Sequence, residues 1–419
     1  MPSQNGKKAL NNYRKTGYIK KNGHSQGCLT FFAVNQTITL SRTQFLFMKK
    51  ILLTALSLAI GSSLFAAAET EVEARLQAMS CIVPVKIQES VTKRIKTMLH
   101  ARKDTEKLIG RSASFFPIFD HYLKELGLPA DLKYITCLET ELNNKTVSSA
   151  NARGIWQLMN DVQEEFGLRV DATVDERLDL YRGTEAALKD IKRMHKAYEN
   201  WELTLAGYNC GVGRLGQAIK RAKSKDFDRV KKFLPQETQD YIPKFIAFTY
   251  VMKNYRLHDL KASLPSLDLQ CIASVKTYSY ISLTTVANIT GLPYEFIQEL
   301  NAQYGEGYVP ENPNGHNIIV PRRVMGALQD YVSNPDAQQQ ANLTFAAMVV
   351  DVNLPEMENE PSYFTTSYTV GEGETLESMA ETFNISAYNI MLWNNLESAT
   401  VAKGKELTLY LPRVVPKRV

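Results

Sequence analysis

The sequence is poor in the residues that build metal centres and disulfide frameworks. It holds five cysteines and six histidines in 419 residues, with no CxxC pair and no histidines at metal-ligand spacing. Four scattered cysteines after the N-terminal region do not make a disulfide scaffold: Cys81, Cys137, Cys210 and Cys271. We therefore expect no metal and no cofactor, and we expect Cys137 and Cys210 to be buried free thiols.

Acidic residues are absent before Glu69. Residues 1–47 contain seven Lys or Arg, and Lys49 and Lys50 add two more. Without these nine cations the chain keeps 40 basic and 44 acidic residues, so its net charge is −4 instead of +5. This balance argues against a nucleic-acid partner, because phosphates favour a basic face.

The chain also lacks a hydrophobic run of the about 20 residues that a membrane span needs. A shorter run, from Ile51 to Phe65, follows two lysines and precedes three alanines. This pattern predicts a secretory signal over residues 48–68, cleaved before Glu69, and an exported, periplasmic protein. Residues 1–47 are then expected to be a mis-assigned extension before the true start. The alternative is a retained membrane anchor. No cysteine directly follows the run to accept a lipid.

Apolar residues recur at helical spacing from about Val91 to Leu257, after a lead-in over residues 69–95. This periodicity predicts an all-α domain over residues 96–260. We expect Thr184 to cap one helix, and Pro235 and Pro243 to mark the beginnings of others.

A repeat follows the helical region. Leu283, Leu300 and Asn301 recur as Leu376, Trp393 and Asn394, at an offset of 93 residues. Each copy has the pattern strand, two short helices, strand, which predicts small α+β modules over residues 270–325 and 366–414. Residues 326–364, with Asn-Pro and a glutamine run, indicate a linker. The predicted fold class is therefore a multidomain protein, with an all-α domain followed by two α+β modules.

One acidic residue stands out in the helical region. On a helical wheel Glu139 lies about 40° from Ile135, inside an apolar arc, whereas Glu141 lies about 240° away, outside it. Desolvation in such a setting raises the pKa of a carboxyl group and keeps a proton available at neutral pH. The alternative is an edge glutamate whose stem packs while its carboxylate stays in water.

Three downstream segments complement this acid. The first, Gly154 to Met159, offers the Trp156 indole for sugar stacking and the Gln157 amide for sugar hydroxyls. The second, Gly207 to Gly211, places Tyr208 and Asn209 at a turn. In the third, Tyr241 is able to donate a hydrogen bond to the acid. Each segment alone is more typical of core packing or of an ordinary turn.

Taken in order, these segments resemble the catalytic (SLT) domain of the lytic transglycosylases of bacterial cell walls, which has a goose-lysozyme-like fold. Glu139-Thr140 matches the Glu-Ser of that family, and the likeness spans about residues 100–255. Its three other motifs match Ala152 to Met159, Gly207 to Gly211 and Glu237 to Ile242. The chain departs from the family pattern at Thr140, Gly207 and Asn160, which affects fine positioning only.

The resemblance implies a reaction in which Glu139 protonates the glycosidic oxygen between N-acetylmuramic acid (MurNAc) and N-acetylglucosamine (GlcNAc). The same group then takes the proton of the muramic 6-hydroxyl, which closes a 1,6-anhydro ring. Asn209 would hold the substrate acetamide or the carboxylate, and Tyr241 would tune Glu139. The full set of implied substrate-binding residues is Thr140, Gly154, Trp156, Gln157, Met159, Tyr208, Asn209 and Tyr241.

The second module resembles the LysM glycan-binding module, through Tyr368-Thr369-Val370 and two further segments. The implied glycan-binding residues are Gly373, Glu374, Thr375, Leu376, Asn395 and Leu396. The first module lacks the Gly-Asp-Thr turn and resembles a degenerate LysM module. This domain order resembles that of the membrane-bound lytic murein transglycosylase D family. It implies peptidoglycan glycan strands as partner, together with unidentified cell-wall synthesis or division proteins, and a location at the cell wall or outer membrane.

Two other functions remain open. A hydrolytic muramidase on the same fold would need a second carboxylate, for which Asp161, Glu164 and Glu165 are the nearby candidates. We expect these three to lie on a solvated helix face. A cell-wall-binding scaffold with a dead catalytic domain is the other alternative, and retention of Glu139 and its partners argues against it.

Overall fold

The computed structural model describes residues 71–334 and 362–413, and all structural statements concern these ranges. The chain divides into two compact units, Met1–Ala66 and Ala67–Val419. The first unit, and with it the predicted extension 1–47 and the signal 48–68, lies outside the described residues.

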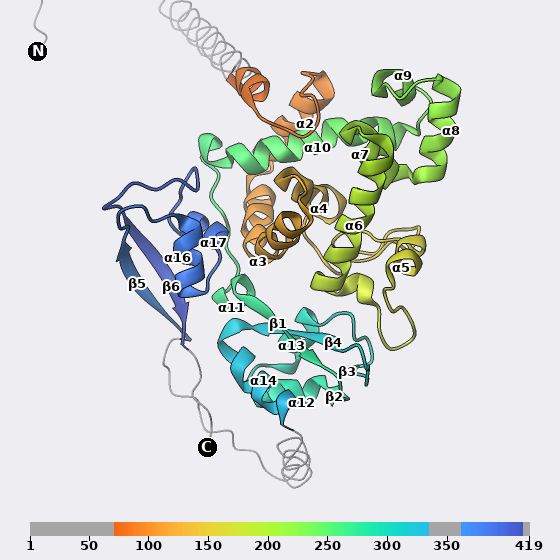
Figure 1. The fold of residues 1–419 in the computed structure, drawn as a ribbon. Helices are drawn as coiled ribbons and strands as arrows, with labels where there is room; N and C mark the ends of the chain where they lie inside the picture. Colours follow the sequence, from red (N-terminus) through yellow and green to blue (C-terminus); the bar gives the residue numbers. More distant parts are fainter. Residues whose placement is uncertain (1–70, 335–361, 414–419) are drawn as a thin grey trace, which may run out of the picture. The chain divides into compact units, whose positions relative to one another are not determined.

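The second unit begins with helices (Figure 1). The shorter 3-10 helices in this region are η1 (Ala130–Lys133), η2 (Glu176–Leu178) and η3 (Tyr255–His258). The α-helices are α2 (Glu89–His100), α3 (Arg102–Leu126), α4 (Tyr134–Thr140), α5 (Asn160–Phe166), α6 (Leu180–Tyr198), α7 (Trp201–Cys210), α8 (Val212–Ala222), α9 (Phe227–Lys231) and α10 (Gln236–Asn254).

The core of the helical region is built around α10. From Tyr241 to Met252 nearly every residue of this helix is buried, and the helix contacts α2, α4 and α7. A helix that is apolar on most sides is typical of the centre of a domain. Its second turn therefore places Tyr241 inside the domain, next to the short helix α4.

The helix α4 ends where the backbone becomes left-handed, at Glu141 (φ 49°) and Leu142 (φ 62°). The side chain of Asn144 then ties three segments together. Its Oδ1 accepts from the backbone N–H of Ile155 (3.0 Å), and its Nδ2 donates to the carbonyl of Leu178 (2.7 Å). The loop after α4, the 153–158 turn and η2 are thus held in one arrangement.

The two modules confirm the predicted order of strand, two helices, strand. In the first, β1 (Ile272–Thr277) pairs antiparallel with β4 (His316–Pro321). The second pairs β5 (Tyr363–Thr369) with β6 (Glu406–Pro412) in the same way. The remaining elements are α11 (Leu267–Gln270), β2 (Ile281–Ser282), α12 (Leu283–Thr290), α13 (Tyr294–Leu300), β3 (Tyr308–Val309), η4 (Arg322–Val324), α14 (Met325–Ser333), α16 (Leu376–Phe383) and α17 (Ala387–Trp393).

Several predicted boundaries differ from the structure. The linker was expected from residue 326, but α14 extends to Ser333 and buries Leu328 completely, so this helix belongs to the first module. The end of the predicted lead-in, 89–95, is the start of α2 and contributes Val91 to the core. Thr184 and Pro243 lie inside α6 and α10 instead of beginning helices, whereas Pro235 directly precedes α10 as predicted.

Gly110→Ala tests the packing of α3. A Cβ at this position would lie 1.7 Å from the carbonyl oxygen of Ser263, in the segment after α10. We expect the free energy of unfolding to fall by about 1–3 kcal/mol, the usual cost of overpacking, measured by chemical denaturation. Gly216→Ala, on α8 with nothing within 4 Å of the new Cβ, is the control and should be neutral or stabilising. Equal effects of the two substitutions would contradict the packing described.

Candidate active site

The carboxyl group of Glu139, in the last turn of α4, is the centre of the site. It is half-buried, on the side of the helix that the helical wheel predicts. Burial raises the pKa of Glu139 to about 7; the Tyr241 hydrogen bond lowers it, the charge of Glu237 raises it and that of Lys244 lowers it. A carboxyl group whose pKa is close to neutral is able both to give and to take a proton.

Tyr241 is the direct partner of this acid. Its phenol donates a hydrogen bond of 2.6 Å to Oε1 of Glu139. The ring is 1% exposed, and burial together with the Glu139 charge raises the pKa of Tyr241 well above its ordinary value. Tyr241 therefore stays protonated and acts as a donor to Glu139.

The end of α7 lies beside this pair. The Tyr208 phenol donates to the carbonyl oxygen of Trp156, and burial raises the pKa of Tyr208 well above its ordinary value. Asn209 accepts a hydrogen bond of 2.7 Å at Oδ1 from the Thr238 hydroxyl on α10. The carboxamide nitrogen of Asn209 has no hydrogen-bond partner among the described residues, which leaves a donor for a substrate oxygen.

The 153–158 turn is held by the residues that the sequence suggested for substrate binding. Gly154 has φ +77°, and a Cβ there would lie 2.0 Å from the carbonyl oxygen of Arg177. The Gln157 amide donates to the carbonyls of Thr146 (3.0 Å) and Gly154 (2.9 Å). The Thr140 hydroxyl donates to the carbonyls of Thr136 (3.1 Å) and Ile155 (3.2 Å). Gly154, Gln157 and Thr140 therefore fix the backbone of the 153–158 turn next to Glu139.

The prediction that Trp156 stacks on sugars is wrong for this structure. The indole is 1% exposed, its Nε1 donates to the Thr184 hydroxyl (2.9 Å), and its ring meets Phe119 edge-on at 5.1 Å. With no exposed face, Trp156 is a core residue beneath the turn. Met159, at the end of the same segment, is 41% exposed and is free to contact a ligand.

Sequence reasoning missed three residues that hold the site together. Thr238 precedes Tyr241 by one helical turn, so its position on the same face of α10 was a usable signal. Thr184 was expected only as a helix cap, because its partner Trp156 is distant in sequence, and Asn144, whose partner is Ile155, gave no signal.

The other candidate acids have different surroundings. Asp161, Glu164 and Glu165 are exposed on α5, as expected, and Glu165 forms an ion pair of 3.0 Å with Arg193. Within residues 71–334 and 362–413 no group of His, Cys, Asp and Glu is arranged to hold a metal ion. The four cysteines in these ranges are free thiols; Cys137 is buried and Cys210 is half-buried.

The residues predicted to bind glycan in the second module fall into two groups. Leu376 and Leu396 are buried in the core of the module, so their side chains offer no surface to a sugar. Glu374 accepts from the Tyr368 phenol (2.6 Å) and the Gly371 N–H (2.7 Å), which shapes the turn. Gly373 has φ +77°, Thr375 caps α16, and Asn395 accepts from Arg256 (2.9 Å).

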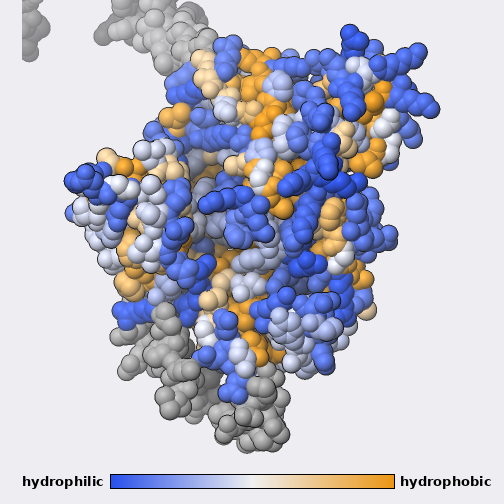
Figure 2. Space-filling model, in the orientation of Figure 1, coloured by the Kyte–Doolittle hydropathy of each residue, from blue (hydrophilic) through white to orange (hydrophobic). Residues whose placement is uncertain are grey.

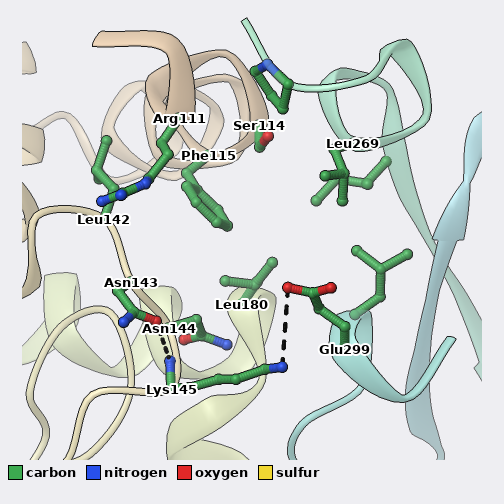
Figure 3. Close-up of a pocket in the computed structure, with 13 residues that line it drawn as sticks. Arg111, Ser114, Phe115, Leu142, Asn143, Asn144, Lys145, Leu180, Leu269 and Glu299 are labelled. Carbon is green, nitrogen blue, oxygen red and sulfur yellow. Dashed lines mark hydrogen bonds and ion pairs between the residues drawn. The ribbon is translucent and has the colours of Figure 1, made fainter. Parts of the chain in front are cut away.

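A separate cavity of about 350 Å³ lies between α3, the loop after α4 and α13 (Figure 3). Phe115, Leu180 and Leu269 give it an apolar lining. Its one carboxylate, Glu299, is 3.9 Å from the Lys145 ammonium. The cavity contains neither Glu139 nor its partners, so it is distinct from the site.

The raised pKa of Glu139 predicts how stability depends on pH. The folded protein binds the Glu139 proton up to about pH 7, whereas the ordinary pKa is 4.5. Stability contributed by the protonated form is therefore present below pH 4.5 and lost as pH rises through 7. Glu139→Gln removes this loss, so its unfolding free energy should exceed that of the wild type by about 3 kcal/mol at pH 8, and the two should agree within about 0.5 kcal/mol at pH 4.5. Equal stabilities at pH 8, by chemical denaturation, would contradict the burial of the charge; titrating groups that do not interact with Glu139 cancel in the comparison.

Three domain families match the chain in order. Residues 118–231 match the transglycosylase SLT domain. Residues 272–337 match the LysM-like domain of lytic transglycosylase MltD, and residues 368–409 match the LysM domain. In the described part of the chain, no helix is both long and apolar enough to cross a membrane.

Two related proteins share part of their sequence with this chain. Membrane-bound lytic murein transglycosylase D of Escherichia coli (strain K12) is 29% identical over 294 residues, which cover 68% of this chain and 61% of that protein. A putative tributyltin chloride resistance protein of Alteromonas sp. (strain M-1) is 30% identical over 104 residues, 25% of this chain and 50% of that protein. The chain thus spans less than two thirds of the length of these relatives.

Among solved structures, the 70 kDa soluble lytic transglycosylase Slt70 from Escherichia coli is 20% identical, with a TM-score of 0.29 over 33% of this chain and 24% of that chain. Lytic transglycosylase Slt from Pseudomonas aeruginosa has the same identity and TM-score over 35% and 25%. The chain therefore has a region that matches the transglycosylase SLT domain, followed by two regions that match LysM-type domains, in an order like that of the first relative.

Proposed function

We propose that this chain cleaves the MurNAc-β-1,4-GlcNAc bond of peptidoglycan without water and leaves 1,6-anhydro-MurNAc ends. The observation that carries the proposal is the half-buried Glu139, whose pKa is raised to about 7 and whose carboxyl accepts from Tyr241. One group with a pKa near the working pH serves as acid and then as base.

In the proposed reaction Glu139 gives its proton to the glycosidic oxygen as the bond from that oxygen to C1 of MurNAc breaks. The substrate acetamide assists the departure of the GlcNAc oxygen. The ionised Glu139 then accepts the proton of the MurNAc 6-hydroxyl, whose oxygen bonds to C1. The proton that Glu139 lost is restored, and no water is consumed.

The neighbouring residues have supporting roles in this proposal. Asn209, with its carboxamide nitrogen directed by the bond between Oδ1 and Thr238, would bind the acetamide or the carboxylate. The exposed Met159 would contact the strand, while Thr140, Gln157 and Tyr208 would hold the 153–158 turn.

The hydrolytic alternative needs a carboxylate that places a water opposite the leaving group. Glu165 is engaged with Arg193, and Asp161 and Glu164 are exposed like it, so these acids give that alternative little support. The dead-scaffold alternative is disfavoured because the acid and its phenol partner are both present and hydrogen-bonded.

We also propose that the LysM-type domains bind glycan strands, and that the protein acts in the periplasm at the cell wall. The matches to LysM families and the similarity to a membrane-bound murein transglycosylase support both points.

Glu139→Gln should reduce release of 1,6-anhydro muropeptides from purified sacculi by about 10³-fold or more, because no other group supplies the proton. The products are identified by mass spectrometry, in which the anhydro product is lighter than a hydrolysis product by one water. Glu141→Gln is the matched control: this acid is two residues away and exposed, and its loss should leave turnover unchanged. Hydrated muropeptide ends from the wild type would contradict the proposed reaction, and full activity of Glu139→Gln would contradict the role of the acid.

Tyr241→Phe should move the pH profile upward. The Tyr241 hydrogen bond lowers the pKa of Glu139, so its removal raises that pKa further above about 7 and extends the acid form to higher pH. The alkaline limb of the kcat/KM profile should shift up by about 0.7 unit, the equivalent of one hydrogen bond of about 1 kcal/mol. Tyr250→Phe, a buried tyrosine on the same helix bonded to His258 (2.9 Å), should leave the limb in place. An alkaline limb of the kcat/KM profile that is unchanged in Tyr241→Phe, or that shifts to lower pH, would refute the role of Tyr241 in setting the pKa of Glu139.

A further inference from the structure

Residues 211–235, here called the basic segment, leave the site and return to it. They comprise α8, α9 and the adjoining turns, between Asn209 at the end of α7 and Thr238 at the start of α10. The Thr238 hydroxyl donates a hydrogen bond of 2.7 Å to Oδ1 of Asn209, so the residues that flank the two ends of the basic segment are in contact. A ligand that binds at either end of the basic segment therefore lies next to Glu139 and its partners.

The basic segment has a charge unlike that of the rest of the exported chain. Only two acids, Asp226 and Asp228, occur in it, and Asp228 is bound to Lys86 (2.7 Å). The chain after Glu69 carries a net charge of −4 overall, so the positive charge is concentrated here. Figure 2 shows hydrophilic residues along the outer edge of this region. The eight cations are Arg214, Lys220, Arg221, Lys223, Lys225, Arg229, Lys231 and Lys232.

The cations of α8 lie on one side of the helix. At about 100° per residue from Leu215, the buried Leu215 and Ala218 (0% and 1% exposed) lie at about 0° and 300°, and Lys220 and Arg221 at about 140° and 240°. The helix dipole favours basic residues in the last turn, but it disfavours Arg214 in the first turn. Helix stability therefore does not explain the positions of all the cations on α8.

Five of the eight cations have no ion-pair or hydrogen-bond partner for their side chains within residues 71–334 and 362–413. Among the described residues, no ion pair or side-chain hydrogen bond is made by the following five exposed groups: Arg214, Lys220, Arg221, Lys223 and Arg229. Arg214 is also close enough to the site for its charge to lower the pKa of the Cys210 thiol, next to Asn209, against a larger effect of burial. Unpaired cations that extend from the edge of a site attract anionic parts of its ligand.

We propose that the basic segment binds the carboxylates of the stem peptides attached to the glycan strand that Glu139 cleaves. This proposal rests on the proposed function. It extends recognition to the stem peptide, which Glu139 and its partners do not contact. An anionic membrane is the other polyanion available to an exported protein. The structure favours the peptide, because Leu215 and Ala218 of α8 are buried in the domain, and the two exposed large apolar side chains of the segment, Val212 and Phe233, lie at its opposite ends instead of forming one apolar face for insertion into lipid.

The test compares the wild type with the triple variant Lys220→Gln/Arg221→Gln/Lys223→Gln. The two substrates are peptide-bearing glycan strands and the same strands after enzymatic removal of the stem peptides. At low salt the variant should have a KM about tenfold higher for peptide-bearing strands, with kcat changed less than about twofold, and added salt should reduce the difference. A matched control, Lys93→Gln/Lys103→Gln/Lys196→Gln, removes three exposed cations from α2, α3 and α6 and should not change KM.

Three outcomes would overturn the proposal. They are an unchanged KM with unchanged binding to phosphatidylglycerol vesicles, an unchanged KM with lost binding to these vesicles, which would assign the segment to a membrane, and an equal rise in KM for peptide-free strands. Cosedimentation with sacculi in the Glu139→Gln background measures binding without turnover. If the wild type released no product but the triple variant still bound less, the proposed function would fail and the basic segment would keep its assignment.

Discussion

The Tyr241 phenol and the Glu139 carboxyl join two helices across 102 residues of sequence. The fold brings them together because α10 runs through the core and presents its second turn to the end of α4. Two opposing effects then act on one carboxyl group. Burial favours the neutral acid, whereas the phenol stabilises the anion. In the proposed reaction, their balance near neutral pH allows a single group to act first as acid and then as base, and that reaction depends on it.

Most of the polar residues around this pair maintain backbone geometry. Thr140 and Gln157 donate hydrogen bonds to carbonyl groups of the surrounding loops. At Gly154 any side chain would clash with the carbonyl oxygen of Arg177. The site is therefore a rigid turn that surrounds one titrating group, with few side chains left to contact substrate directly. In the proposed function, binding of a long polymer would therefore also use surfaces beyond the turn, such as the basic segment and the LysM-type domains.

Local patterns in the sequence predicted the fold class, the repeated module and the side of α4 on which Glu139 lies, because each depends on periodicity or on neighbouring residues. Long-range contacts were the source of the errors. Trp156 was predicted to face sugar, but Thr184 and Phe119 enclose its ring, and neither is near it in sequence. Similarly, α14 was taken for linker because its burial depends on the rest of the first module. A local motif identifies the residues of a site, whereas only tertiary packing decides which of them reach solvent.

Direct titration of the Glu139 carboxyl tests the central claim without any assumption about substrate. The carboxyl carbon resonances of protein labelled with ¹³C-glutamate can be followed from pH 3 to 10, with Glu139 assigned by its absence in Glu139→Gln. We expect a midpoint of about 7 for this residue. A midpoint at its ordinary value of 4.5 would show that the carboxylate is ionised and solvated at neutral pH, and the acid–base role of Glu139 would have to be abandoned.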